Sequence, residues 1–285
     1  MSGKSFLETY IMRIDIHTHA WLSHGAKRAV QALSRGFGLQ CEASGVLDDL
    51  VNEERKADMD RACVLCCAAR GEHVHAVNRF AISLLAKDSL LLPFGTVHPE
   101  LPSWEEELDF LASAGIGGIK LHPDYQGFRL DDKAMFPLYE AMSGRFCLLV
   151  HVGSRQKQGG CKTLFSTPRQ LERIAGSFPS LHIIGAHMGG WCMWDDVEEI
   201  FAHGCPENLW FDTSNTSFHA DSSRLGRLLR ILPCDRLVFG SDWPFFRVEG
   251  ELARLQAVGL SGRQMDDLTR NGERLLKLYY PCLGQ

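Results

Sequence analysis

The sequence predicts an α/β fold, a (β/α)8 TIM barrel that comprises residues 1–285 as a single domain. Short, almost entirely apolar runs alternate with amphipathic stretches, which is the pattern of buried parallel strands joined by helices. In addition, polar side chains collect at the C-terminal ends of these runs, where barrel enzymes carry their active sites. The eight expected strands are residues 11–17, 62–68, 90–97, 115–121, 146–152, 182–187, 208–214 and 236–242.

Helical periodicity fills the intervals between the expected strands. Clear examples are residues 104–115, 134–144, 168–178 and 224–232. Pro168 begins one of them, and proline is favoured in the first turn of a helix. An open, doubly wound sheet would show the same alternation and remains an alternative. The first strand is not followed by G-x-G-x-x-G, which argues against a dinucleotide-binding version of that sheet.

The overall composition disfavours several classes of protein. The formal net charge of −5 gives no field that would attract nucleic acid or an anionic membrane. No apolar run reaches the roughly 18–20 residues that span a bilayer, and the N-terminus lacks a secretion signal, so we expect a cytoplasmic protein. Ten cysteines are scattered along the chain. The C-x-x-C of Cys63 and Cys66 lies in an apolar run, which favours buried free thiols over a zinc ribbon.

The H-x-H formed by His17 and His19 is the sharpest signal in the sequence. Side chains two residues apart on a strand point the same way, so we expect both imidazoles to enter the barrel mouth and share one metal ion. His73 and His75 also form an H-x-H, but they stand at the start of an expected helix, where residues two apart diverge by about 200°. We therefore interpret the second pair as surface residues.

Further polar residues follow the later strands at the same end. A buried charge without a partner is costly, so several histidines and an aspartate at strand ends favour a metal site over a packed core. These residues are Lys120 and His122 after the fourth strand, His151 after the fifth, His187 after the sixth and Asp242 after the eighth.

Five motifs, in this order, resemble the amidohydrolase superfamily: IDIHTHA, GIKLHP, LLVHVG, IIGAHMGG and LVFGSDWP. The similarity is closest to the amidohydrolase-related branch that contains aminocarboxymuconate-semialdehyde decarboxylase. The resemblance implies that His17, His19, His151 and Asp242 bind a divalent metal, expected to be zinc. It also implies that His187 acts as a catalytic base or electrophile, while Asp242 accepts a proton from the water that the metal activates.

Lys120 leaves two versions of the metal centre open. As an ammonium it would bind an anionic substrate or pair with Asp242, and the site would hold one metal. If CO2 carboxylated Lys120, it could bridge two ions, as in the binuclear branches of the superfamily, with His151 and His187 as ligands of the second ion. We expect one metal per chain, because the motif set resembles the mononuclear branch.

The loops at the expected active face predict an anionic substrate. Arg155 lies in the loop after the fifth strand, Arg247 follows the eighth, and residues 20–44 form a basic insertion that we expect to act as a lid. Basic side chains at a site bind carboxylates, although a solvated surface is the alternative interpretation. Trp191 is placed to stack on a planar substrate, and His122 is a further candidate contact.

These observations together predict a metal-dependent hydrolase that uses metal-activated water on a C–N or C–O bond of a small carboxylate-bearing substrate. The same residues would serve a non-hydrolytic decarboxylase of an unsaturated or aromatic carboxylic acid, so that function stays open. A third interpretation is a non-enzymatic metal-binding barrel. Members of the resembling branch are often homodimers, so a homodimer is the expected assembly.

Overall fold

The structure is a computed structural model that describes residues 10–154 and 164–283. Within these ranges the strands pair side by side in parallel and in chain order. The first group is β1 (Ile14–Thr18), β2 (Arg61–Leu65) and β3 (Leu91–Phe94). The second is β4 (Gly118–Leu121), β5 (Cys147–Val150), β6 (Ile183–Gly185), β7 (Leu209–Asp212) and β8 (Leu237–Val238).

Backbone hydrogen bonds join these two groups of strands into a closed ring. Between β3 and β4, Gly95 N donates to Gly118 O at 2.9 Å. Between β8 and β1, Ile16 N donates to Phe239 O at 2.9 Å. A ring closed at both junctions is a barrel, so the predicted fold is confirmed and the open-sheet alternative is wrong.

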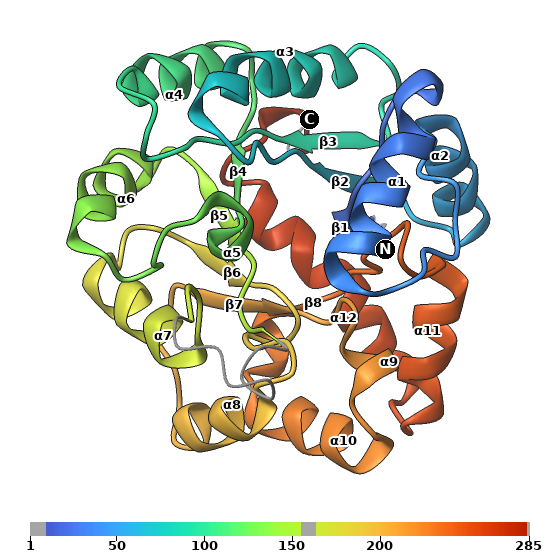
Figure 1. Cartoon of the computed structure of the whole chain (residues 1–285). Coiled ribbons are helices and arrows are strands. Elements are labelled where there is room, and N and C mark those ends of the chain that lie inside the picture. Colours follow the sequence, from blue (N-terminus) through green and yellow to red (C-terminus); the bar gives the residue numbers. More distant parts are fainter. Residues whose placement is uncertain (1–9, 155–163, 284–285) are drawn as a thin grey trace, which may run out of the picture.

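Helices surround the ring of strands (Figure 1). Thr167 caps α7 by accepting a hydrogen bond from Gln170 N, and Pro168 occupies the first turn, as the sequence predicts. In chain order the helices are α1 (Ser23–Phe37), α2 (Leu47–Lys56), α3 (Val74–Leu84), α4 (Trp104–Ser113), α5 (Pro123–Gln126), α6 (Phe136–Met142), α7 (Pro168–Ser177), α8 (Trp194–Phe201), α9 (Thr216–His219), α10 (Ser222–Ile231), α11 (Val248–Ala257) and α12 (Gly262–Leu276).

The barrel interior is apolar below the polar strand ends. Side chains such as Ile14, Cys63 and Leu149 pack there with residues from the end of α12 and beyond, including Leu275 and Tyr280. Tyr280 donates its hydroxyl proton to Pro93 O at 2.8 Å, which holds the C-terminal segment against β3. The described cysteines are free thiols. No helix in the described ranges is long and apolar enough to cross a membrane.

The eighth strand is much shorter than the expected run 236–242. Regular pairing ends at Val238, and Asp242 has a φ of 62°, a left-handed conformation that a strand cannot contain. The chain therefore leaves the sheet early and turns Asp242 into the mouth of the barrel.

The insertion at 20–44 consists mainly of α1, which buries only one of its residues, Ala26. The two ends of the insertion are bonded to each other, and its C-terminal end is bonded to the segment after β8. Trp21 N donates to Gly45 O at 2.9 Å, and Ala43 N donates to Pro244 O at 3.1 Å. The helix between these anchors has little packing of its own, so its position depends on the few side chains, Phe37 among them, that reach the barrel mouth.

Candidate metal centre

Three side chains converge at the mouth of the barrel and form what we call the three-donor pocket: His17, His19 and Asp242. His17 Nε2 lies 3.5 Å from Asp242 Oδ1, and His19 Nε2 lies 3.7 Å from the same oxygen. Ligand atoms about 2.1 Å from an ion at tetrahedral angles are about 3.4 Å apart. The spacing therefore suits a single ion among the three atoms.

Hydrogen bonds fix the proton positions on both histidines. His17 Nδ1 lies 2.8 Å from Asp212 Oδ2, and His19 Nδ1 lies 3.1 Å from Leu65 O. Both oxygens only accept, so each Nδ1 carries the proton and each Nε2 presents a lone pair to the pocket. Burial lowers the pKa of His17 well below its ordinary value and that of His19 to about 3, so both rings stay neutral. Two lone pairs and a carboxylate oxygen in one buried place need a cation, which a divalent metal would supply.

Lys120 is the one cationic side chain that the described structure places in contact with this pocket. Its Nζ lies 3.4 Å from His17 Nε2, and the side chain is 1% exposed. Burial lowers its pKa to about 8, while the charges of Asp212 and Asp242 oppose that shift. The ammonium can therefore bind an anion at the pocket, and it can lose its proton more readily than a surface lysine.

His187 and His151 face each other beside the pocket. His187 Nε2 and His151 Nδ1 are 3.0 Å apart. The opposite nitrogen of each ring points to a carbonyl, Ser214 O at 2.9 Å for His187 and Gly153 O at 3.2 Å for His151. If both rings donate to these carbonyls, two lone pairs face each other, an arrangement that needs an additional proton or cation. His151 lies outside the group formed by His17, His19 and Asp242, so its predicted role as a ligand remains a prediction.

Both His187 and Asp242 occupy left-handed backbone conformations, with φ angles of 59° and 62°. Residues other than glycine seldom adopt these angles, and such strain persists where surrounding bonds enforce it. Asp212 Oδ1 accepts from His187 N at 2.9 Å, and Asn215 Nδ2 donates to Asp242 Oδ2 at 2.9 Å. Side chains at and just after the end of β7 thus hold His187, which follows β6, and Asp242, which follows β8.

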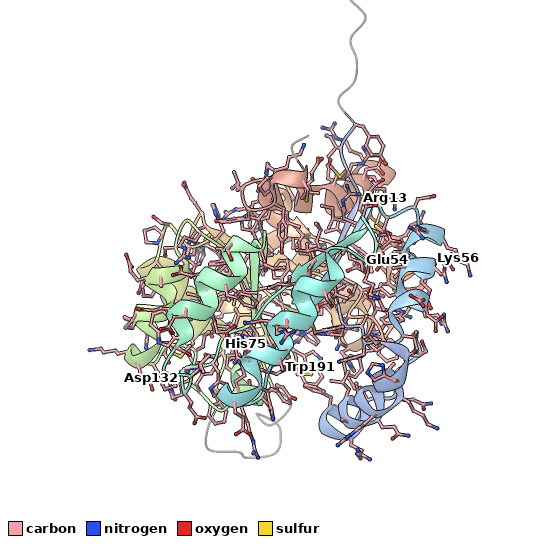
Figure 2. The ribbon with its side chains drawn as sticks, turned by 90° about the horizontal axis from the view of Figure 1, so that it is seen from above. Arg13, Glu54, Lys56, His75, Asp132 and Trp191 are labelled. Atoms are coloured by element: carbon pink, nitrogen blue, oxygen red, sulfur yellow. The ribbon has the colours of Figure 1, made fainter. Side chains whose placement is uncertain are left out.

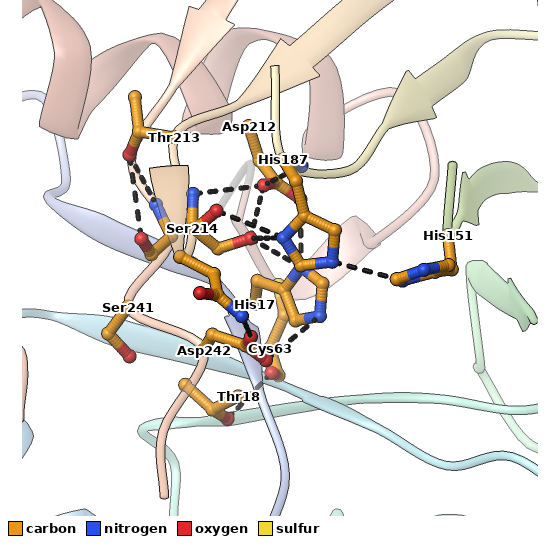
Figure 3. Close-up of polar contacts among 12 residues, drawn as sticks. His17, Thr18, Cys63, His151, His187, Asp212, Thr213, Ser214, Ser241 and Asp242 are labelled. Atoms are coloured by element: carbon orange, nitrogen blue, oxygen red, sulfur yellow. Dashed lines mark hydrogen bonds and ion pairs between the residues drawn. The ribbon is translucent and has the colours of Figure 1, made fainter. Parts of the chain in front are cut away.

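Asp212, the last residue of β7, is a functional residue that the sequence analysis missed. Its Oδ2 accepts from His17, and its Oδ1 accepts from His187 N, from Ser214 N at 3.0 Å and from Ser214 Oγ at 2.5 Å (Figure 3). Ser214 Oγ also lies 3.0 Å from His17 Nδ1 and 2.9 Å from His187 Nδ1. The available signal was position, because Asp212 ends a strand of the same barrel as the predicted ligands do.

Aromatic rings form one wall beside the histidines. Phe37, at the end of α1, has its ring centroid 5.6 Å from His122, 6.3 Å from Trp191 and 5.8 Å from Phe245. Trp191 in turn lies 6.1 Å from His151. Trp191 and His122 therefore lie beside the pocket, as predicted, and the insertion contributes a ring of its own. We refer to Phe37, His122, Trp191 and Phe245 as the ring wall.

The ligand atoms of His122, Asp124 and His151 lie close together, but their arrangement does not suit a second metal ion. The His122 and His151 rings stack with centroids 3.9 Å apart and an interplanar angle of 10°. The lone pair of an imidazole lies in its ring plane, and two nearly parallel planes do not meet at one ion about 2.1 Å from both. His122 Nδ1 also accepts a hydrogen bond from Tyr125 N.

Two predicted substrate-binding residues remain, Arg247 and Arg155. Arg247 forms an ion pair with Glu53, its side chain is 55% exposed, and its backbone N donates to Glu42. Its charge is therefore paired with an acid, and its role in substrate binding remains a prediction. Arg155 lies outside the described residues. His75 Nδ1 contacts Glu107 Oε1 at 2.6 Å, and His73 is exposed, consistent with a surface pair.

The amidohydrolase family model matches residues 14–271. The chain belongs to the amidohydrolase family. A search of curated protein sequences finds no match.

Solved structures share the fold at low sequence identity. An uncharacterised TIM-barrel protein from Bordetella bronchiseptica has a TM-score of 0.73 at 15% identity, covering 96% of this chain and 99% of its own. A dihydroxybenzoic acid decarboxylase from a Polaromonas species, with bound manganese and the inhibitor 2-nitroresorcinol, has a TM-score of 0.70 at 17% identity, covering 94% and 98%. A putative 2-pyrone-4,6-dicarboxylic acid hydrolase from Pseudomonas putida has a TM-score of 0.61 at 16% identity, covering 95% and 98%. The protein thus shares its fold with a protein described as a decarboxylase and with one described as a putative hydrolase.

Proposed function

We propose that this amidohydrolase-family protein is a metal-dependent decarboxylase of a planar aromatic or unsaturated carboxylic acid. This proposal places the sequence-based alternative above hydrolysis of a C–N or C–O bond. The observation that carries it is the combination of the three-donor pocket and Lys120 with the adjacent ring wall. The fold shared with the manganese-bound dihydroxybenzoic acid decarboxylase supports the same choice.

One divalent ion per chain fits the pocket formed by His17, His19 and Asp242, with zinc and manganese as the candidates to test. When bound, the ion would polarise an oxygen of the substrate and stabilise negative charge on it. His151 is the proposed further ligand. The described free thiols support the expected cytoplasmic location, because free thiols are typical of that compartment. The predicted homodimer remains a proposal.

The residues around the pocket have separate proposed tasks. Lys120 would bind the carboxylate or a neighbouring phenolate of the substrate, because it is the buried ammonium at the pocket. The ring wall would hold the planar part of the substrate by stacking. Asp242 would accept a proton from a substrate hydroxyl, and His187 would deliver a proton to the ring carbon.

The reaction would break the bond between the ring carbon and the carboxylate carbon. The electron pair stays on the ring carbon, CO2 leaves, and a proton takes its place. Decarboxylation in D2O must therefore place one deuterium on that ring carbon. Hydrolysis instead adds water across a C–N or C–O bond and releases acid without CO2.

The decisive experiment combines these two readouts on the metal-loaded protein. A panel of hydroxylated benzoic acids is assayed for CO2 release and for deuterium in the product. Lactones are assayed by pH-stat and amides by release of the amine. We expect CO2 and one deuterium per turnover, both absent from the His17→Ala/His19→Ala double variant. Turnover of a lactone or amide without CO2 from any benzoate would replace the proposal by hydrolysis.

A further inference from the structure

The carboxylate of Asp15, a residue of β1, lies behind the three-donor pocket. Asp15 precedes His17 by two residues and is fully buried. Its Oδ1 accepts from two backbone N–H groups, His17 N at 3.0 Å and Ser241 N at 3.1 Å. Ser241 directly precedes Asp242. One carboxylate oxygen therefore joins the strand that carries the two histidines to the turn that carries the aspartate.

The rest of the Asp15 carboxyl group faces another acid, Glu54 of α2. Both side chains are 0% exposed, and besides this burial the charge and side chain of Asp15 both raise the pKa of Glu54. In Figure 2, which is seen from above relative to Figure 1, Glu54 lies nearer to Arg13 than to Trp191. Glu54 is a residue of α2 and does not belong to the three-donor pocket.

This pair needs a shared proton. Within residues 10–154 and 164–283, Asp15 Oδ2 and both Glu54 carboxyl oxygens have no hydrogen-bond donor in reach. Two ionised carboxylates in contact would repel each other, and buried polar atoms without partners are costly. A proton held by Glu54 removes both difficulties, because its O–H can donate to Asp15 Oδ2. Burial, followed by the charge of Asp15, raises the pKa of Glu54 well above its usual range.

We propose that Asp15 and Glu54 are positioning residues that hold β1 and the turn after β8 at the separation that metal binding requires. Backbone bonds already link the two segments, since Asp242 N donates to His17 O at 2.8 Å and His19 N donates to Trp243 O at 2.7 Å. Asp15 adds the bonds immediately next to a predicted ligand on each segment. Glu54 keeps Asp15 oriented by occupying its second oxygen. Residues of this kind behind a metal ligand typically contribute 10- to 100-fold in metal affinity.

The inference rests on the metal-binding part of the proposed function, and metal binding alone tests it. Zinc and manganese affinities of the full-length protein are measured by competition with a chromogenic chelator, together with the melting temperature of the metal-free protein. Glu54→Gln keeps a donor, an N–H in place of the O–H. Asp15→Asn keeps the oxygen that accepts from the two backbone groups and turns its own N–H to Glu54. Both variants should stay within about threefold of the wild-type affinity.

Variants that cannot make these bonds should behave differently. Glu54→Leu and Asp15→Ala should each lower affinity for both metals tenfold or more. Glu107→Leu is the matched control, since Glu107 is a buried glutamate on α4 bonded to His75 and Asn78. It should lower the melting temperature without changing metal affinity. If Glu54→Leu does not fold, Glu54→Met replaces it, because methionine adapts to irregular space.

Two outcomes would overturn the positioning role. One is wild-type metal affinity in Glu54→Leu or Glu54→Met, whatever the melting temperature. The other is a loss in Glu54→Gln as large as in the apolar variants, since the donor would then be irrelevant. If the wild-type protein binds metal but releases no CO2, the proposed reaction is wrong. The metal affinities of the variants then still test the positioning role. A wild-type protein that binds neither metal would overturn the metal site and this inference together.

Discussion

Asp212→Asn changes a single atom, yet the contacts of Asp212 predict a large loss of metal affinity. Three donors surround Oδ1, namely His187 N, Ser214 N and Ser214 Oγ. The amide oxygen of asparagine must take that position, because an NH2 group there would face donors. The NH2 group then faces His17 Nδ1, where the carboxylate accepted a hydrogen bond at 2.8 Å.

His17 can restore that hydrogen bond only by moving its proton to Nε2. That nitrogen then has no lone pair for the three-donor pocket. Loss of a carboxylate behind a ligating histidine typically lowers metal affinity 10- to 100-fold, which corresponds to about 1.4–2.8 kcal/mol. We expect this loss for both zinc and manganese.

Chelator competition measures the affinity, and circular dichroism checks that the variant is folded. Asp131→Asn is the matched control, because Asp131 is also largely buried but pairs with Arg129 and Arg173 away from the pocket. The control should bind metal as the wild type does. A folded Asp212→Asn protein within twofold of the wild-type affinity would refute the assignment of the proton to His17 Nδ1.

Three further predictions test the other parts of the site. His187→Gln should lower kcat about 100-fold while metal content stays unchanged, as for loss of an acid–base group outside the ligand set; a parallel loss of metal would make His187 a ligand. Lys120→Met should raise KM for an anionic substrate tenfold or more, from loss of a charge-assisted hydrogen bond of about 1.5–3 kcal/mol, and should retain one ion per chain. Burial lowers the pKa of His122 well below 6.5, so the folded protein binds fewer protons there than the unfolded chain does. Below about pH 6.5 the free energy of unfolding of the wild type, measured by urea unfolding, should therefore fall by about 1.4 kcal/mol per pH unit relative to that of His122→Phe. The same pH dependence in both proteins would contradict this.

The fold could be predicted because its signals are local and repeated. Each buried strand has its own apolar run, and each strand end adds a polar residue. The boundaries were less accurate where the site itself distorts the backbone. The expected strand 236–242 fails after Val238 because Asp242 adopts a left-handed conformation, which the local sequence does not reveal.

The candidate site was predictable for residues that belong to a motif. His17, His19 and Asp242 converge as expected, and Lys120 reaches the same pocket. Asp212 escaped prediction because its role is to accept hydrogen bonds from groups far apart in the chain, and no short motif encodes such contacts.

The charge of a loop residue does not by itself show what that residue binds. Arg247 is predicted to bind substrate from its sign and position, and an acid from another element, Glu53, is close enough to pair with it. Phe37 shows the opposite case. It lies in a segment that attracted attention for its basic residues, yet its apolar ring makes the contact with the site. Sequence indicates which loops reach the mouth of a barrel, whereas packing decides which side chains face it.

Lys120 connects the metal and the substrate in this site. Its ammonium lies 3.4 Å from His17 Nε2, the same lone pair that a metal ion would use. Two cations cannot share one lone pair, so metal binding should displace the ammonium from His17. The displaced charge stays buried at β4, and an unpaired buried charge is costly. A substrate carboxylate or phenolate would neutralise it. Metal binding should therefore make an anionic substrate bind more tightly, and by linkage the substrate should tighten metal binding by the same factor. Lys120→Met should abolish most of this coupling, which sets it apart from a variant that only weakens substrate binding.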